Sequence, residues 1–285
     1  MMDIDKAQGE TVLLKLGGSL ITDKQQPRTL RAKTLARLAE EIAQARAQRP
    51  SLKLVLGHGA GSFAHVSAKE HGTRLGVSNW QQWMGFLEVW WDAAVLNRLV
   101  VEALINTGLP VIALPPSAAI TARDGKVESW DIGPLEAALN AGLLPVIHGD
   151  VIFDSFRGGT ILSTEDLFSH LADRINPSRL LLAGMERGVW QDFPTRTRII
   201  EKITPQNFQD LMPVIGESTA TDVTGGMQDK VKQCISLSES IPTMDILIFS
   251  GDEPGTLLNV LLGSSQGTVI TNSDLPSLAR EDGGL

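Results

Sequence analysis

Short, nearly continuous apolar runs alternate along this chain with stretches of amphipathic helical spacing. The runs, each bounded by glycine or proline, span residues 12–16, 52–56, 111–114, 143–147, 180–183 and 246–249. Such runs are typical of strands buried on both faces of a parallel sheet. Between two of them, Leu35, Leu38 and Ile42 share one face of a predicted helix. The alternation predicts an α/β fold of three layers, with helices on both faces of a central, mainly parallel sheet.

Two segments depart from this alternation. Asp124-Gly125 stands between short β-prone runs in residues 119–130, which predicts a β-hairpin. Residues 80–104 form a long predicted helix with four of the six tryptophans, and one face carries the stripe Trp80, Trp83, Met84, Leu87 and Trp91. A helical stripe of this kind is typical of a core or a dimer contact. It would also suit a pocket for an apolar substrate tail, so both interpretations stay open.

Three glycine turns each lie near a basic residue. They are Lys15-Leu16-Gly17-Gly18-Ser19, the loop from Gly57 to His65, and Thr224-Gly225-Gly226-Met227 with Lys230. Glycine lets backbone amides approach a ligand closely, and the start of a helix favours an anion. The spacing matches neither the Walker motif nor the dinucleotide fingerprint. The turns indicate a site for a chain of phosphates, and the competing interpretation is tight packing of strand against helix.

Basic side chains lie where the strands are predicted to end, which is where open α/β sheets bind ligands. Lys15 is costly to bury in an apolar strand unless an anion or a carboxylate meets it. His65 lies where the second glycine loop enters its helix, so it could donate a hydrogen bond to a phosphate. His58 and His148 each precede a glycine, and such positions more often hold structural histidines than ligands.

The carboxylates give weaker evidence of a functional site than the basic residues do. Asp150 is expected to end a strand, and Glu165 and Asp166 lie at a predicted helix start. Helix capping explains Glu165 well and Asp166 only partly. No His, Cys or Asp cluster has the spacing of a metal site. We therefore expect no dedicated metal ligands, and any Mg²⁺ would be held mainly by substrate phosphates.

Composition narrows the class of protein. The chain has 285 residues, 42% of them hydrophobic, and a net charge of −8. This suits one α/β domain, and the lack of a basic stripe argues against nucleic acid as a partner. A single cysteine excludes a disulfide framework. With no signal peptide and no apolar run of about 18 residues, we expect a cytoplasmic protein without a membrane partner.

At this point the motifs resemble the amino acid kinase family over residues 11–271. The matching pieces are residues 15–19 with 21–24, 57–65, 148–151, 163–172, and 222–227 with Lys230. His65 narrows the resemblance to the branch of isopentenyl phosphate kinases and the related fosfomycin kinases. The resemblance implies the amino acid kinase fold, a homodimer, and ATP-dependent, Mg²⁺-assisted phosphorylation of isopentenyl phosphate. It also implies an acceptor-binding lobe at 11–177 and a nucleotide-binding lobe at 178–271, within one domain over 1–285.

The resemblance further implies roles for single residues. The catalytic group would be Lys15, Lys24, His65 and Asp166. In it the lysines neutralise the transferring phosphoryl group, His65 orients the acceptor phosphate, and Asp166 holds the lysines. The ATP phosphates would be bound by Gly17, Gly18, Ser19, Gly61, Gly226 and Lys230. The acceptor would be bound by Ala60, His65 and Gly149. Phosphoryl transfer needs such positioning and charge neutralisation more than covalent chemistry.

One segment departs from the family pattern. Residues 183–190 keep a glycine and an aromatic residue, but lack most of the acidic residues that related kinases carry there. This leaves the nucleotide base open. Two other functions also stay open: a kinase of the same fold acting on another small phosphate or phosphonate such as fosfomycin, and a non-catalytic nucleotide- or oxyanion-binding protein. Retention of Lys15, Lys24, Asp166 and Lys230 argues against the second.

Overall fold

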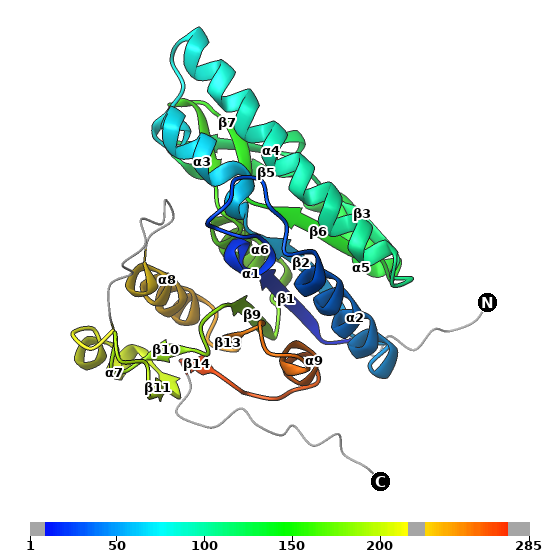
Figure 1. Ribbon diagram of the computed structural model, residues 1–285, viewed down its shortest axis with the longest axis vertical. Helices are drawn as coiled ribbons and strands as arrows, with labels where there is room; N and C mark the ends of the chain where they lie inside the picture. Colours follow the sequence, from blue (N-terminus) through cyan, green and yellow to red (C-terminus); the bar gives the residue numbers. More distant parts are fainter. Residues whose placement is uncertain (1–8, 216–225, 273–285) are drawn as a thin grey trace.

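The computed structural model describes residues 9–215 and 226–272, in which strands and helices alternate (Figure 1). The strands are β1 (Thr11–Leu16), β2 (Lys53–His58), β3 (Val111–Ala113), β4 (Ile120–Arg123), β5 (Lys126–Trp130), β6 (Leu144–His148), β7 (Asp150–Asp154), β8 (Gly158–Leu162), β9 (Arg179–Gly184), β10 (Val189–Trp190), β11 (Ile199–Ile200), β12 (Lys202–Ile203), β13 (Asp245–Ser250) and β14 (Thr268–Ile270). The helices are α1 (Gly18–Ile21), α2 (Ala32–Gln48), α3 (Gly61–His71), η1 (Thr73–Leu75), α4 (Trp80–Ile105), η2 (Pro116–Ala118), α5 (Gly133–Asn140), α6 (Thr164–Ile175), α7 (Pro205–Leu211), α8 (Met227–Ser240) and α9 (Thr256–Leu261).

Among the described residues, an eight-stranded sheet has the order β12-β14-β13-β9-β1-β2-β6-β3. The pairs from β13 to β3 are all parallel, whereas β14 runs antiparallel to β13. The six strands predicted from the apolar runs are β1, β2, β3, β6, β9 and β13, and all are present. The prediction of an α/β fold around a mainly parallel sheet is therefore confirmed.

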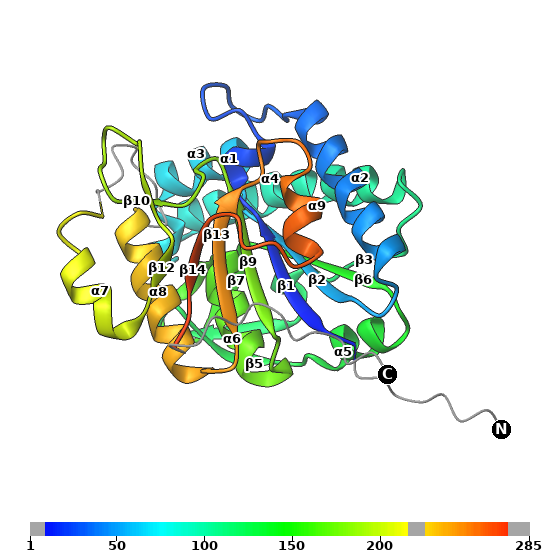
Figure 2. The same cartoon turned by 90° about the horizontal axis from the view of Figure 1, so that it is seen from below.

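Helices cover both faces of this sheet (Figure 2). On β1, Val12, Leu14 and Leu16 pack into a cluster with α2, α4 and α9. Leu13, between them, packs on the other face into a cluster with α5, α6 and α8. The near-continuous apolar runs of the inner strands thus arise because both of their faces are buried, whereas the edge strand β3 is only partly buried. The three predicted layers are present.

A four-stranded sheet, β5-β4-β7-β8, lies beside the main one. The predicted hairpin is β4 and β5, and its turn residues Asp124 and Gly125 both have positive φ, 50° and 75°. The Asp154 carboxylate accepts from both turn amides, at 3.1 and 2.8 Å, and so joins this hairpin to the β7–β8 hairpin. The expectation that Asp150 ends a strand is wrong: β6 ends at His148, the chain turns at Gly149, and Asp150 begins β7.

The predicted tryptophan-rich helix is α4, and most of its stripe faces outward. Trp80, Met84, Leu87 and Trp91 are exposed, whereas Trp83 is partly buried against a small apolar cluster. In the part of the chain that the structure describes, no helix combines the length and apolar character needed to cross a bilayer.

Candidate active site

A cavity of about 660 Å³ opens at the carboxyl ends of β1, β2 and β9. Its lining comes from segments far apart in the sequence: the loops after β1, β2 and β9, the starts of α6 and α8, and the helix α3. Ligands of α/β proteins bind at this end of the strands, and pockets of 300–1,000 Å³ hold small ligands.

The first two glycine turns touch each other at the cavity wall. A side chain on Gly18 would begin 2.4 Å from the backbone nitrogen of Gly61. Gly61 has a φ of +52°, and a Cβ there would lie 2.1 Å from Thr22 Oγ1. That hydroxyl donates to the Gly18 carbonyl at 2.7 Å and accepts from the Ser62 amide at 2.9 Å. Close packing thus explains these glycines in part, and it makes the two turns one unit. Sequence reasoning gave Thr22 no role.

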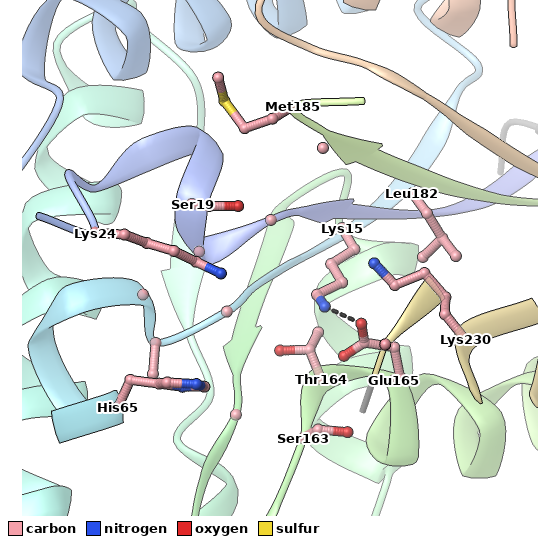
Figure 3. A pocket seen from close by; sticks show the side chains of 18 of the residues that line it. Lys15, Ser19, Lys24, His65, Ser163, Thr164, Glu165, Leu182, Met185 and Lys230 are labelled. Carbon is pink, nitrogen blue, oxygen red and sulfur yellow. Dashed lines mark hydrogen bonds and ion pairs between the residues drawn. The ribbon is translucent and has the colours of Figure 1, made fainter. Parts of the chain in front are cut away.

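Lys15 and Glu165 form an ion pair in the cavity (Figure 3). Lys230 of α8 points toward the same place in Figure 3. Burial would raise the pKa of Glu165, but the charges of Lys15 and Lys230 outweigh it and hold the pKa below its ordinary value. The carboxylate is therefore ionised between two ammonium groups. This satisfies the requirement that a buried lysine meet an anion.

The position between the lysines was assigned to Asp166, and the structure gives it to Glu165. Asp166 closes a capping box at the start of α6: its carboxylate accepts from the Ser163 amide at 2.8 Å, and its amide donates to Ser163 Oγ at 3.1 Å. It also pairs with Arg74 at 3.2 Å. The third helical residue folds back on the cap, whereas the second, Glu165, faces β1. The expectation that Glu165 caps and Asp166 holds the lysines was thus reversed.

Lys24 and His65 point into the cavity from the opposite side (Figure 3). Ala60 and Gly149 also line it, in line with the predicted acceptor side. Next to His65 the wall becomes apolar, through Ala64, Ala68, Val89 and Ile161.

Of the two interpretations of the tryptophan stripe, the pocket for an apolar tail is contradicted. Helix α4 presents Val89 to the cavity, and none of Trp80, Trp83, Met84, Leu87 and Trp91 lines it. Four of these five side chains are exposed on another face of the helix. Spacing along a helix identifies a face, but not what that face meets.

The two strand-end histidines are structural, as their positions suggested. His58 Nδ1 donates to the Gly59 carbonyl at 3.2 Å, and Asn97 donates to His58 Nε2 at 3.1 Å. The rings of His58 and His148 stack 5.4 Å apart. Burial and the neighbouring ring lower the pKa of His58 to about 3, and burial lowers the pKa of His148 to about 4. Both rings are neutral at pH 7 and support the cavity wall from behind.

At the far end, the cavity is lined by the start of α8 and by the segment after β9. Gly226 is the N-cap of α8 and Lys230 lies in its first turn, where the helix dipole favours phosphate. Thr224 and Gly225, the rest of that turn, lie outside the described residues. Glu186 accepts from Trp190 Nε1 at 2.6 Å and pairs with Arg196 at 3.3 Å.

Among residues 9–215 and 226–272, no group of three or more His, Cys, Asp and Glu side chains could hold a metal ion. The cavity instead gathers every predicted site residue: Lys15, Gly17, Gly18, Ser19, Lys24, Ala60, Gly61, His65, Gly149, Asp166, Gly226 and Lys230. Asp166 lies with the others, but the contact with Lys15 belongs to Glu165. The arrangement suits a polyphosphate at one end and a small anion with an apolar part at the other.

The sequence model of the amino acid kinase family matches residues 10–250, and the chain belongs to that family.

Within it, the chain is similar to isopentenyl phosphate kinases. It is 34% identical over 272 residues to the one from Methanothermobacter thermautotrophicus, covering 91% of this chain and 98% of the relative. It is 29% identical to the one from Methanocaldococcus jannaschii, covering 92% and 99%. A solved isopentenyl phosphate kinase structure matches with a TM-score of 0.76 at 28% identity, covering 92% of this chain and all of that chain. A carbamate kinase from Giardia lamblia shares the fold alone, with a TM-score of 0.67 at 15% identity.

Proposed function

We propose that this protein transfers the γ-phosphoryl group of ATP to isopentenyl phosphate, giving isopentenyl diphosphate and ADP. One observation carries the proposal: a cavity with basic groups at its centre continues, past His65, into an apolar wall of Ala64, Ala68, Val89 and Ile161. A phosphate monoester with a short hydrocarbon tail has the same two parts. The named relatives point to the same acceptor.

In the proposed reaction a terminal oxygen of the acceptor phosphate forms a bond to the γ-phosphorus, and the bond from that phosphorus to the β-phosphate oxygen breaks. The attacking phosphate is ionised at neutral pH, so no strong base is needed. Lys15 and Lys24 would neutralise charge on the transferring group, and Glu165 would hold Lys15 toward it. His65 would bind and orient the acceptor phosphate.

The nucleotide phosphates would lie along the glycine turns and the start of α8. The close approach of Gly18 and Gly61 leaves backbone, with no side chain, facing the ligand. Ser19, Gly226 and Lys230 would complete the phosphate contacts. Mg²⁺, held mainly by the substrate phosphates, would supply positive charge that reduces their repulsion, with few protein ligands.

The base subsite would be formed by Met185, Trp190 and Phe193, which line the cavity after β9. The Arg196 guanidinium lies 5.3 Å from the centre of the Phe193 ring. Residues 11–177 would then supply most of the acceptor site and residues 178–271 most of the nucleotide site, within one domain.

We also propose a homodimer that covers the exposed side of α4. Trp80, Met84, Leu87, Trp90 and Trp91 are between 40% and 75% exposed along one helix, and apolar patches of this kind usually mark contact sites. Location in the cytoplasm stays a prediction from the sequence.

A coupled assay of ADP release across a panel of acceptors tests the proposal. The panel is isopentenyl phosphate, dimethylallyl phosphate, fosfomycin and simple alkyl phosphates, each with ATP and Mg²⁺. We expect the highest kcat/KM for a five-carbon monophosphate and a new diphosphate signal in ³¹P NMR. The variant Val89→Trp, which fills the apolar wall, should raise the KM for isopentenyl phosphate and leave the KM for ATP unchanged.

Two outcomes would contradict the proposal. A higher kcat/KM for fosfomycin would assign the protein to the phosphonate branch of the same fold. Nucleotide binding by calorimetry without turnover of any acceptor would indicate a non-catalytic binding protein.

A further inference from the structure

The loop between α1 and α2, residues 22–31, carries Lys24 to the cavity, and Leu30 near its end packs against the core. Residues 24–28 are all exposed, so burial in the core does not fix their position. The ends of the loop are joined by a bridge between Thr22 and Leu30. Two backbone contacts hold it to the start of α3: the Arg28 amide donates to the Ser62 carbonyl at 3.0 Å, and the Thr29 amide donates to Ser62 Oγ at 3.3 Å.

The side chain of Arg28 ties the tip of this loop to α4. Arg28 Nη2 lies 2.6 Å from Asp92 Oδ1, in the middle of α4. Arg28 has a φ of +51°, a conformation that non-glycine residues rarely adopt and that persists only where surrounding contacts hold it. The contact with Asp92 is one of the contacts that hold this conformation, together with the hydrogen bonds to Ser62, and it is the one that links the loop to α4.

The surroundings of the Asp92 carboxylate favour a cation beside it. It is 2% exposed, and its other oxygen accepts from Ser67 Oγ of α3 at 3.1 Å. A buried carboxylate is costly unless it is paired and hydrogen-bonded. Burial raises the pKa of Asp92, while the bond from Ser67 and the charge of Arg28 oppose the rise. Asp92 thus joins three elements: the loop with Lys24, the helix with His65, and α4.

We propose that Asp92, acting through Arg28, is a positioning residue that fixes Lys24 over the transferring phosphoryl group. Ser67 lies two residues after His65 on α3, so the same carboxylate sets Lys24 and the acceptor-binding helix relative to each other. The proposal rests on the role of Lys24 in the proposed function. The pair itself does not touch substrate.

A double-mutant cycle tests it, with Asp92→Asn and Lys24→Met made alone and together. In the presence of Lys24, we expect Asp92→Asn to lower kcat about tenfold and to leave the KM for ATP within about twofold. In the Lys24→Met protein, Asp92→Asn should change kcat less than about twofold, because there is no ammonium group left to position. A role in stability alone would lower activity by the same factor in both backgrounds, and that result would overturn the proposal.

A matched control is available on α2. Arg37 and Glu41 form an ion pair of the same 2.6 Å length, with Glu41 also buried, and neither residue lines the cavity. Glu41→Gln should lower thermal stability and show no coupling to Lys24→Met. If Asp92→Asn folds poorly, Arg28→Gln removes the same pair from its exposed end and should give the same non-additive cycle.

A second measurement needs no substrate and so separates this proposal from the proposed function. Hydrogen exchange of the amides of residues 23–29, followed by mass spectrometry, should become at least about tenfold faster in Arg28→Gln and Asp92→Asn. It should stay unchanged in Glu41→Gln. Unchanged exchange in the first two variants would overturn the proposal, whereas wild-type protein that does not turn over isopentenyl phosphate would contradict only the proposed function.

Discussion

At the scale of single residues, neighbouring carboxylates at the start of α6 divide two tasks. Glu165 lies between two lysines in the cavity, and Asp166 caps the helix and pairs with Arg74. Glu165 is the second residue of the helix and Asp166 the third. Two consecutive acids in a sequence do not show which of them caps the helix and which faces the cavity.

We therefore expect Glu165→Gln to lower kcat roughly tenfold to a hundredfold, since it removes a charged hydrogen bond worth about 1.5–3 kcal/mol. Some loss of thermal stability should accompany it, because Lys15 loses the carboxylate that it meets in the cavity. Asp166→Asn should lower stability by about 1 kcal/mol through the weakened cap and leave kcat nearly unchanged. Steady-state kinetics and thermal melts of both variants check this, and the opposite pattern would return the positioning role to Asp166.

His65 offers a second residue-scale prediction. His65→Ala should lower kcat/KM for the acceptor roughly tenfold to a hundredfold through the lost hydrogen bond to phosphate. ATP affinity, measured by calorimetry, should not change, because the ATP phosphates would be bound by the glycine turns and Lys230 and not by the imidazole of His65. His65→Gln, which keeps a donor of similar reach, serves as the control and should recover part of the activity. Near-normal turnover of His65→Ala would contradict the proposal that His65 binds the acceptor phosphate.

Every site residue predicted from the sequence lines the cavity, because glycine turns and isolated basic residues at strand ends leave a clear signal. It did not predict Thr22, whose hydroxyl joins the first two turns, or the contact of Arg28 with Asp92. Such contacts join segments that lie 40 and 64 positions apart, and no local spacing records them. The roles of Glu165 and Asp166 were exchanged for the same reason, because the contact of Glu165 with Lys15 joins residues far apart in the sequence.

At the scale of elements, the stacked histidines at the ends of β2 and β6 make stability depend on pH. Both have pKa values below the ordinary 6.5, so below that pH the unfolded chain binds protons that the folded chain does not. Each then lowers the free energy of unfolding by up to about 1.4 kcal/mol per pH unit. Burial raises the pKa of Asp150 to about 6, so its contribution has the opposite sign between pH 6 and 4.

The net expectation is a loss of about 1.4 kcal/mol per pH unit between pH 6 and 4 from these three groups. Urea unfolding at several pH values measures it. In His148→Gln the contributions of His58 and Asp150 nearly cancel, so the dependence should flatten over that range. An unchanged slope in His148→Gln would show that other groups control the acid sensitivity.

The strands were predictable as far as apolar runs mark them. Those of the main sheet that are buried on both faces were all found, and the β4–β5 hairpin was found from Asp124-Gly125. The run through β6 and β7 was misread because Gly149 turns the chain from one sheet to the next without a recognisable turn sequence. The short pairs at the edge, β10 with β11 and β12 with β14, have two or three residues per strand and carry no periodic signal.

At the scale of the whole molecule, the exposed face of α4 predicts assembly. Leu87→Glu and Trp91→Glu should halve the mass seen by analytical ultracentrifugation, because a buried charge opposes an apolar contact. Turnover per active site should survive, since neither residue lines the cavity. Ile112→Glu, at an exposed apolar position on β3, is the control and should leave the mass unchanged. Sedimentation of the wild-type protein as a monomer would contradict the proposed homodimer.

The central sheet continues through both proposed lobes, because β9 is hydrogen-bonded to β1 on one side and to β13 on the other. Lys15 lies on β1, next to the strand that leads into the nucleotide side. Hinged closure between halves would have to break or strongly twist these ladders, so the spacing between donor and acceptor is built into the scaffold. For inhibitor design, this favours a rigid molecule that joins adenosine to an alkyl phosphate by a linker of one fixed length. Affinity across a series of such linkers should peak sharply at a single length.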